Sequence, residues 1–478
     1  MNEISRRPQP TGSTGSVARY FRYPEEVREE FIQTDDIEFR DGSRVTAAEV
    51  WEYLTKVGPV KYPVLYDDSD NFFGRLSRDF TLPANLKGAY LQMTLHDRMT
   101  KARAQGHPIV FVQGGQPFDA YYAAGAVALR PALVGQWARR QREGLTRNQD
   151  LVESAAAKQK AYHAISFEIC NSGGYEHIQE GDVPVDLVAP ITTLRCSDVP
   201  YGAEAHRHGP RKDDVELLIV DYPMAHQKDK EWAIQYFADN LRLLVKKIDS
   251  LTGRTTTEDD LALTIKRHNE GRRLAQEIAE LWWSAEHPPT NGQDRAFLAL
   301  LGLLDFHGDP VASLSVLREA KRSIERRVQQ GHRAEGVKEN AARLFVLGSC
   351  VSPNSVRTEE AGGIIVGKDD GWSDVTTLVD ESGEPYYELA KAALSLPYEQ
   401  SLTERARWTA EQIRKSRAAG VVFLYKWGCN TQSAVAAPLL DEIRAQTGVP
   451  GIVIEDDNWN TSTEQTQNRV NAFVEMVS

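Results

Sequence analysis

Four cysteines are the residues of this 478-residue chain whose type and placement could do chemistry: Cys170, Cys196, Cys350 and Cys429. Three of them follow predicted strands, and Cys170 lies beside a double glycine at a predicted helix end. No Cys-x-x-Cys pair is present, so the spacing does not favour a zinc ribbon or a thioredoxin-like site. The pattern alone leaves three interpretations open, namely packing thiols, a catalytic thiol and metal ligands, with packing thiols leading.

The C-terminal stretch 420–457 predicts how one of these thiols is positioned. Val421 to Tyr425 form a continuous apolar run, which is typical of a parallel strand buried on both faces. Cys429 comes after this run, and helical spacing follows until Gly448. Ligands of open α/β sheets gather at the carboxyl ends of strands, so Cys429 is expected where a ligand would bind.

Short apolar strands alternate with helices on both sides of a purely helical stretch. The sequence therefore predicts an α/β fold with two Rossmann-like, doubly wound lobes at residues 105–256 and 339–478. A helical region at 257–338 connects them, because strand signals vanish there. Residues 1–104 are predicted to form an N-terminal extension that is partly disordered, at the start of its first 35 residues or so, and then helical.

Composition narrows the class of protein. Hydrophobic content of 41% and charged content of 26% are typical of a globular protein. The net charge of -12 argues against nucleic acid as the main partner, which would need a clustered positive face. No apolar run approaches the ~20 residues that span a bilayer, and no secretory signal is recognisable, so a cytoplasmic location is expected.

Several common sites are disfavoured. The segment Gly362–Lys368 resembles a phosphate-binding loop, but Asp369 stands where a Ser or Thr would hold magnesium, and the residues between look like strand. His206 and His208 lie in a charged segment that is predicted to be a solvated loop. The serines beside Cys350 do not lie in a Gly-x-Ser-x-Gly elbow, so a hydrolase triad is not indicated.

Blocks of residues across about 105–478 carry a resemblance to a known family. The longest are Leu424-Tyr-Lys-Trp-Gly-Cys429-Asn430, Gly448-Val-Pro-Gly-Ile-Val-Ile-Glu-Asp-Asp457 and Gln467-Asn-Arg469-Val-Asn-Ala-Phe473-Val-Glu. Shorter ones are Val366-Gly-Lys-Asp369-Asp370, Val220-Asp221-Tyr-Pro223 and Leu251-Thr-Gly253. In order and spacing they resemble a cluster-binding subunit of the 2-hydroxyacyl-CoA dehydratase and ATP-dependent (class I) benzoyl-CoA reductase family.

The resemblance implies that three cysteines hold an iron–sulfur cluster between two Rossmann-like lobes. By position these correspond to Cys170, Cys196 and Cys429, whereas Cys350 has no counterpart among the ligands. A [4Fe–4S] cluster held by three thiolates leaves one iron a replaceable position, by the logic of an open catalytic zinc site. A double-cubane [8Fe–9S] cluster is the alternative cofactor.

The resemblance also implies a reaction and partners. In the family an acyl-CoA thioester is reduced by one electron at a potential that ferredoxins, at about −400 mV, do not reach. A partner iron–sulfur ATPase therefore supplies the electron, and a homologous cluster-binding subunit works beside this one. The chain itself has no credible Walker loop, which fits the recipient of the electron.

Two departures from the family leave the substrate open. Gln116-Pro-Phe-Asp119 replaces a Pro-x-Glu sequence, and Leu396-Pro-Tyr398 replaces a Pro-Cys-Pro-like element. The Arg- and Ala-rich composition indicates a high-GC coding sequence, which fits a host that degrades aromatic compounds better than one that ferments amino acids. It therefore favours an oxidoreductase acting on an aromatic acyl-CoA, like benzoyl-CoA reductase. The alternatives are a 2-hydroxyacyl-CoA dehydratase (a lyase), a double-cubane reductase of small molecules, and a scaffold subunit whose thiols ligate nothing.

Overall fold

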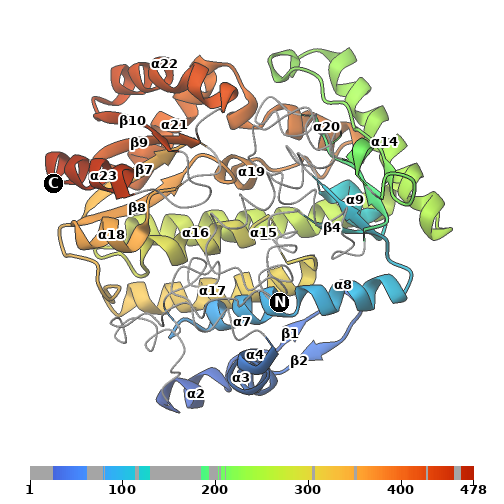
Figure 1. Ribbon diagram of the computed structural model, residues 1–478, viewed down its shortest axis with the longest axis horizontal. Helices are drawn as coiled ribbons and strands as arrows, with labels where there is room; N and C mark the ends of the chain where they lie inside the picture. The colour runs from blue at the N-terminus through green and yellow to red at the C-terminus, as the bar shows by residue number, and fades with distance from the viewer. Residues whose placement is uncertain are drawn as a thin grey trace, which may run out of the picture.

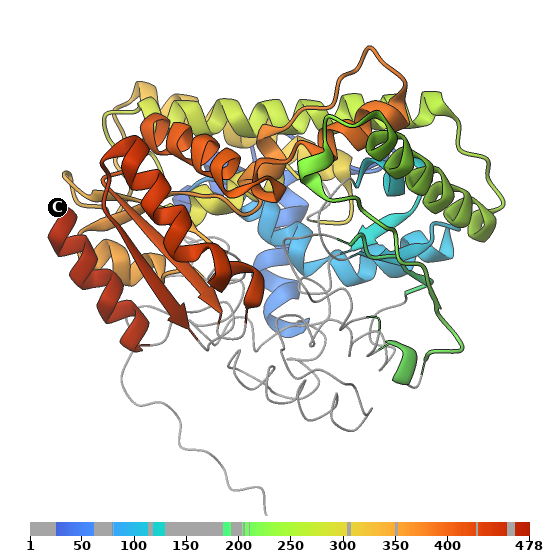
Figure 2. The same cartoon turned by 90° about the horizontal axis from the view of Figure 1, so that it is seen from above.

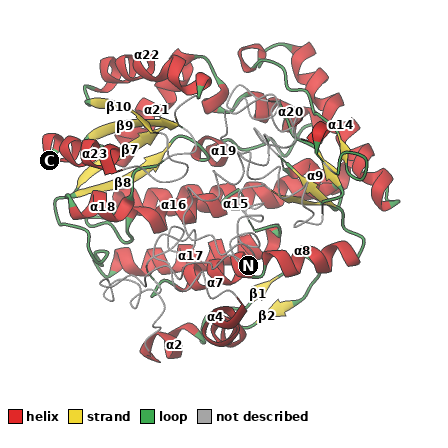
Figure 3. Cartoon of the chain, viewed as in Figure 1, coloured by secondary structure: helices red, strands yellow, loops and turns green. Residues whose placement is uncertain are grey.

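The structure is a computed structural model, and it describes residues 25–61, 79, 81–112, 118–129, 185–192, 203, 206–209, 211–303, 307–348, 352–426, 429–456 and 464–478. These residues form an α/β protein with two four-stranded parallel sheets set apart from each other, and helices lie between and around them (Figures 1 and 3). The predicted fold class is confirmed. None of the helices in these ranges combines the length and apolarity needed to cross a bilayer.

The first sheet has the strand order β4-β3-β5-β6, with every pair parallel. Its strands are β3 (Ile109–Phe111), β4 (Val127–Leu129), β5 (Leu187–Val188) and β6 (Glu216–Leu217). A further parallel bridge between Ile191 and Val220 continues the pairing of β5 with β6. The sequence predicts longer strands at β5 and β6 and does not predict β4.

The second sheet has the order β10-β9-β7-β8, again all parallel. Its strands are β7 (Ala342–Leu347), β8 (Gly363–Lys368), β9 (Gly420–Lys426) and β10 (Gly451–Asp456). In both sheets the first strand in the chain lies between the second and the third. The winding therefore reverses between β3 and β5 and between β7 and β9, and ligands of such sheets bind outside the carboxyl ends of strands at these switch points.

Both faces of the first sheet are buried, as parallel sheets require. Alternate residues of β3 point to opposite sides, so Ile109 and Phe111 join one apolar core and Val110 joins another. The core around Val110 is closed by three helices: α9 (Asp119–Ala123), α14 (Glu231–Thr252) and α20 (Pro385–Leu394).

The second sheet is covered in the same way. Phe345 and Phe423 face one core, and Leu344 and Leu424 face another. Helices α21 (Leu402–Ser416) and α22 (Asn430–Thr447) pack on the first of these faces. Helices α18 (Ser355–Glu360) and α23 (Glu464–Val477) pack against each other and against strands on the opposite face. The helices that follow β7 and β9 thus lie on opposite sides, which opens the crevice between those two strand ends.

A long helix, α15 (Glu258–Ser284), reaches from one sheet to the other (Figures 1 and 2). It begins at a capping box, in which Thr257 and Asp260 each accept the other's backbone N–H. At about 1.5 Å per residue it is roughly 40 Å long. It contacts α9 and α20 beside the first sheet and α19 (Trp372–Thr376) and α21 beside the second. Helix α15 therefore connects the helices that cover the first sheet with those that cover the second.

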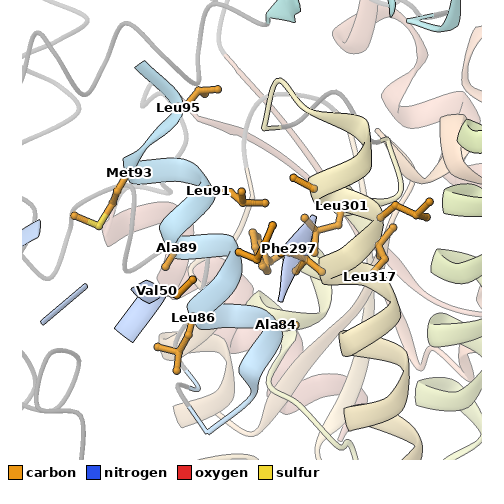
Figure 4. Packing of buried hydrophobic residues seen from close by; sticks show 14 of the residues in the cluster. Val50, Ala84, Leu86, Ala89, Leu91, Met93, Leu95, Phe297, Leu301 and Leu317 are labelled. Atoms are coloured by element: carbon orange, nitrogen blue, oxygen red, sulfur yellow. The ribbon is translucent and has the colours of Figure 1, made fainter. Parts of the chain in front are cut away.

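The N-terminal unit packs against α16 (Gly292–Leu301) and α17 (Pro310–Gln329) (Figure 4). It comprises α2 (Glu25–Phe31), β1 (Ile37–Glu38), β2 (Arg44–Val45), α3 (Ala47–Glu52), a π-helical turn (Tyr53–Val57), α4 (Gly58–Lys61), α7 (Pro83–Met93) and α8 (Leu95–Ala104). Helix α2 lies near the end of the stretch whose beginning is predicted to be disordered, and its Phe31 is buried against Trp51. The apolar spacing of Ala89 to Ala104 predicts one helix, but the structure has two helices with a break at Thr94.

Gly348 holds the end of β7 against β9 and is expected to be intolerant of a side chain. Its φ is +100°, and a Cβ there would lie 2.1 Å from the carbonyl oxygen of Leu424. Gly448 also has a positive φ, +72°, but open space around it. We expect Gly448→Ala to lower the free energy of unfolding by about 1 kcal/mol, from backbone strain alone. Gly348→Ala should cost about 2–4 kcal/mol, since overpacking adds to strain.

Urea unfolding of the parent chain and the two variants measures the free energy of unfolding that each substitution costs. Equal losses for the two alanine variants would contradict the close approach of β7 and β9.

Candidate functional site

Cys429 lies where the sequence predicts it, beyond the end of β9 and beside the switch point with β7. It is the N-cap residue of α22, its side chain is half-buried, and its Sγ lies 3.5 Å from Thr431 Oγ1. Its carbonyl accepts the N–H of Ser433 at 2.9 Å. Cys429 thus stands at the N-terminus of an 18-residue helix, and cysteine is a residue type that binds metals.

The side chain of Gln432, on the first turn of the same helix, is also set up for a ligand. It is 2% exposed, and its Oε1 finds no hydrogen-bond donor in the described part of the chain. A buried acceptor without a donor is costly, so such an atom marks a place where a water or a ligand group belongs.

The other cysteines lie outside the described residues. Cys196 follows β5 in the sequence, Cys350 follows β7, and Cys170 precedes β5. Within the described ranges no three His, Cys, Asp or Glu side chains converge as a metal site. The three-cysteine site of Cys170, Cys196 and Cys429 therefore stays a prediction.

Asp369 fixes the turn that leaves β7. Its Oδ1 accepts the backbone N–H groups of Gly348 (3.1 Å) and Asp370 (2.8 Å). Its Oδ2 accepts Nε of Arg405 at 3.1 Å and a second, shorter bond from Nη2. Both side chains are buried, and Arg405 stacks on Tyr398 at 4.1 Å. The Asp369 carboxylate keeps the pKa of Arg405 above its usual value in spite of burial, so Arg405 is charged and the strand end is held rigidly.

Asp119, the first residue of α9, is the corresponding buried carboxylate beside the first sheet. It has no exposed surface, and its Oδ2 accepts Nη2 of Arg272 at 2.9 Å. Its Oδ1 lies 3.2 Å from Nδ1 of His268. Burial alone would raise the pKa of Asp119, but Arg272 and His268 outweigh it and hold that pKa far below the usual range. Asp119 is therefore an ionised anchor and not a proton donor at neutral pH.

A cavity of about 30 Å³ lies against this cluster, between segments that leave both sheets. It is lined by Phe118, His268 and Arg272 on one side and by Asp374 and Thr377, beyond β8, on the other. His268 is 2% exposed, and its Nε2 has no hydrogen-bond partner among the described residues. A polar cavity of this size accommodates about one water molecule. The cavity thus lies beside α15, between the start of α9, which follows β3, and α19, which follows β8.

Neither a role for Asp119 nor its contacts with Arg272 and His268 are predicted from the sequence. The signal is visible in hindsight on α15, where polar residues interrupt a buried apolar stripe at helical spacing. The stripe comprises Leu261, Ile265, Ala275, Ile278 and Trp282, and the interruption comprises His268, Asn269 and Arg272. Asn269 is also engaged, donating to Val379 O (2.7 Å) and accepting Val379 N–H (3.1 Å). Buried polar residues mid-helix need partners elsewhere in the fold.

His206 contradicts its prediction as a solvated loop residue. It is 2% exposed, and its Nε2 is 2.7 Å from the carbonyl oxygen of Val215. Burial lowers the pKa of His206, so the ring is neutral and acts as a packed donor at the start of β6. His208 is exposed, as predicted. The residues within the Walker-like segment form strand β8, which removes the phosphate-loop interpretation.

The family model of the 2-hydroxyglutaryl-CoA dehydratase D-component matches residues 121–477, most of the chain. The chain belongs to this family. The match begins within α9, so the N-terminal unit and β3 lie outside it.

Two curated relatives are similar at low identity. A protein named as a dehydratase subunit, YjiM, of Escherichia coli (strain K12) is 24% identical over 271 residues, covering 54% of this chain and 67% of the relative. A protein of Thauera aromatica that is named as one of the subunits of benzoyl-CoA reductase is 25% identical over 229 residues, covering 45% of this chain and 56% of the relative. The chain thus spans about two thirds of one relative and little more than half of the other. Both relatives are named as enzyme subunits, and their names point to different reactions.

Removing the counter-charge of Asp119 tests the anchor. In Arg272→Met a buried carboxylate keeps only His268 as partner, and stability is expected to fall by about 3–5 kcal/mol. The neighbouring Arg273 pairs with Glu381 at the surface and is the matched control, with an expected loss of less than about 1 kcal/mol for Arg273→Met. Urea titration at pH 7 gives both values.

The stability that Asp119 contributes depends on pH, and the direction follows from the shift of its pKa. Because folding lowers the pKa of Asp119, its contribution is complete above its unfolded pKa of about 3.9 and is lost as the pH falls further. The stability gap between the parent chain and Arg272→Met should therefore narrow below about pH 4. A gap independent of pH would contradict an ionised Asp119.

Proposed function

We propose that this chain is the iron–sulfur cluster-carrying subunit of an ATP-dependent, low-potential reductase that acts on an aromatic acyl-CoA. The observation that carries the proposal is the placement of Cys429: a half-buried thiol at a helix N-terminus, beside a switch point, in a chain of the 2-hydroxyglutaryl-CoA dehydratase D-component family. Cys170 and Cys196 are the proposed further ligands.

The donor chemistry at Cys429 fits such a group. Iron–sulfur clusters are held by cysteine thiolates, and Cys429 stands at the N-terminus of α22. Strand order supports Cys196 as its counterpart, since Cys196 follows the third strand of the first sheet as Cys429 follows the third strand of the second. A bound [4Fe–4S] cluster would supply electron transfer at low potential.

The chain's own residues would hold the site in shape. Asp369 and Arg405 fix the turn after β7, which borders the same switch point as Cys429. Asp119 and Arg272 fix the segment after β3 against α15. Rigid support of this kind keeps a cofactor and a substrate in one geometry and limits the entry of water. His268 lines the small cavity there, and its Nε2 has no hydrogen-bond partner among the described residues.

Two reactions are candidates, aromatic acyl-CoA reduction and 2-hydroxyacyl-CoA dehydration. The Arg- and Ala-rich composition favours aromatic acyl-CoA reduction. One relative is named a benzoyl-CoA reductase subunit and the other a dehydratase subunit, at nearly equal identity. A radical 2-hydroxyacyl-CoA dehydratase is therefore the second candidate, and its support is the dehydratase name of the family itself. In either case the proposed partners are a homologous cluster-binding subunit and an iron–sulfur ATPase that donates the electron.

Cysteine replacement tests the cluster directly. Purified without oxygen, the parent chain is expected to hold roughly four irons and four acid-labile sulfides. Cys429→Ser should lose most of them yet keep its stability, because serine is itself a good N-cap residue. Cys170→Ser and Cys196→Ser should lose the iron as well, whereas the matched control Cys350→Ser should retain it.

Full iron in Cys429→Ser, or an iron-free parent chain, would overturn the proposal in favour of a scaffold subunit. The reaction is then chosen by incubating the complex with its activator ATPase, ATP and either benzoyl-CoA or a 2-hydroxyacyl-CoA. Ring reduction of benzoyl-CoA is the expected outcome, and dehydration of the second substrate alone would select the second candidate.

A further inference from the structure

A second cavity, of about 170 Å³, lies at the opposite edge of the first sheet from the proposed cluster. Its walls come from the β1–β2 turn, from α8 and from the starts of β4 and α17, including Arg40, Arg98, Val127 and Asp309. Val127 is the first residue of β4, so the cavity lies at the amino end of the sheet. Figure 1 shows α8 and the β1–β2 pair side by side, below this sheet. Most of the lining precedes residue 121, where the family match begins.

Two arginines bring positive charge to this cavity. Arg40 donates through Nη1 to the carbonyl oxygen of Ala126 at 2.9 Å, while its Nη2 is buried without a hydrogen-bond partner among the described residues. Arg98 donates through Nη2 to the carbonyl oxygens of Leu91 (2.7 Å) and His307 (2.9 Å). These acceptors are neutral, so they satisfy N–H groups without cancelling either charge.

The acids of the cavity are already committed. Asp309 uses Oδ1 to cap α17 at Val311 and Ala312 and uses Oδ2 to accept the backbone N–H of Arg40 at 3.2 Å. Asp41 pairs with Lys101 at 3.2 Å. Within the described residues neither guanidinium has a carboxylate at ion-pair distance. With Asp41 and Lys101 cancelling each other, two arginines face Asp309 alone, and one positive charge is in excess.

The electrostatics of the neighbouring groups agree with an excess of positive charge. Burial lowers the pKa of Arg40 and of Arg98, and the pKa of Arg98 is lowered further by Arg40. Burial and the nearby Arg40 also lower the pKa of His107, whose Nδ1 is 2.8 Å from the carbonyl oxygen of Gly125. His107 is therefore neutral at pH 7. Buried charges without partners are expensive, so the arrangement is completed by an anion.

The remaining walls select the kind of anion. Phe39, Tyr90, Leu95 and Met99 line the cavity, and the Arg98 guanidinium lies 5.7 Å from the centre of the Phe39 ring. Aromatic and aliphatic walls favour an apolar body, while the positive charges of Arg40 and Arg98, which also line the cavity, favour a carboxylate. The volume corresponds to roughly five or six waters, which suits a single ring or a short chain.

We propose that this cavity binds a small organic monocarboxylate, with the carboxylate against the Arg40 side chain and the apolar body lying against Phe39 and Met99. The site is separate from the switch points of both sheets, so its ligand is not the molecule that would react at the cluster. It joins the N-terminal unit to the first sheet, because Arg40 belongs to the former and Ala126 immediately precedes β4 in the latter. Binding is therefore expected to stabilise the contact between these two parts.

Isothermal titration of the full chain with sodium benzoate and with sodium hexanoate tests the proposal, with sodium chloride and phosphate at equal ionic strength as comparison arms. We expect saturable binding of at least one carboxylate, and an increase in melting temperature with its concentration. Arg40→Met should weaken binding about tenfold or more, since a hydrogen bond from a charged donor is lost. The matched control is Arg44→Met on the same β1–β2 pair, where Arg44 pairs with Glu38 in solvent and does not line the cavity.

Ala102→Leu provides a second variant, which keeps both arginines and fills the cavity from α8; it should also abolish binding. Absence of saturable binding by both carboxylates would overturn the proposal. So would an equal response to all four salts, which is ionic strength alone, or unchanged affinity in a folded Arg40→Met or Ala102→Leu protein. Because the titration needs no iron, its outcome is independent of the cluster.

Discussion

The structure depends on a carboxylate that water cannot reach. Asp119 has no exposed surface, and an uncompensated charge there would be severely destabilising. Arg272 and His268 compensate it, and both come from the middle of α15. Asn269, on the same turn, exchanges two hydrogen bonds with the backbone of Val379, which follows α19 in the chain. One turn of one helix thereby fixes α9, beside the first sheet, and the segment that follows α19.

Much of this architecture follows from local sequence. The helices at α14, α15 and α17 are predicted almost to the residue, because their apolar spacing is regular and cap residues such as Thr257 and Asp309 mark their starts. The strands of the second sheet are predicted as well, since each is a continuous apolar run. The first sheet is harder to predict. β4 is not predicted, because it is only three residues long and is held by its pairing with β3, which no local pattern records.

The candidate site likewise has features that local sequence predicts and contacts that it does not. That Cys429 follows a strand and begins a helix can be predicted, because a buried strand, a turn and an amphipathic helix each leave a local signature. That Asp119 meets Arg272 cannot, because the two residues are 153 positions apart and a single sequence holds no record of the contact. The same holds for Arg40, whose charge looks ordinary in the sequence. Only the three-dimensional arrangement reveals that, among the described residues, it lacks a carboxylate partner.

The buried pair between Lys87 of α7 and Glu319 of α17 joins residues 232 positions apart in the chain, with the apolar core of the N-terminal unit around it. A ribosome adds about 5–20 residues per second, so the interval between synthesis of these two residues is on the order of tens of seconds. During that time the face of α7 that carries Leu91 has no α17 to pack against. The nascent chain therefore exposes this apolar face until α17 has been made, which favours aggregation at that stage of folding.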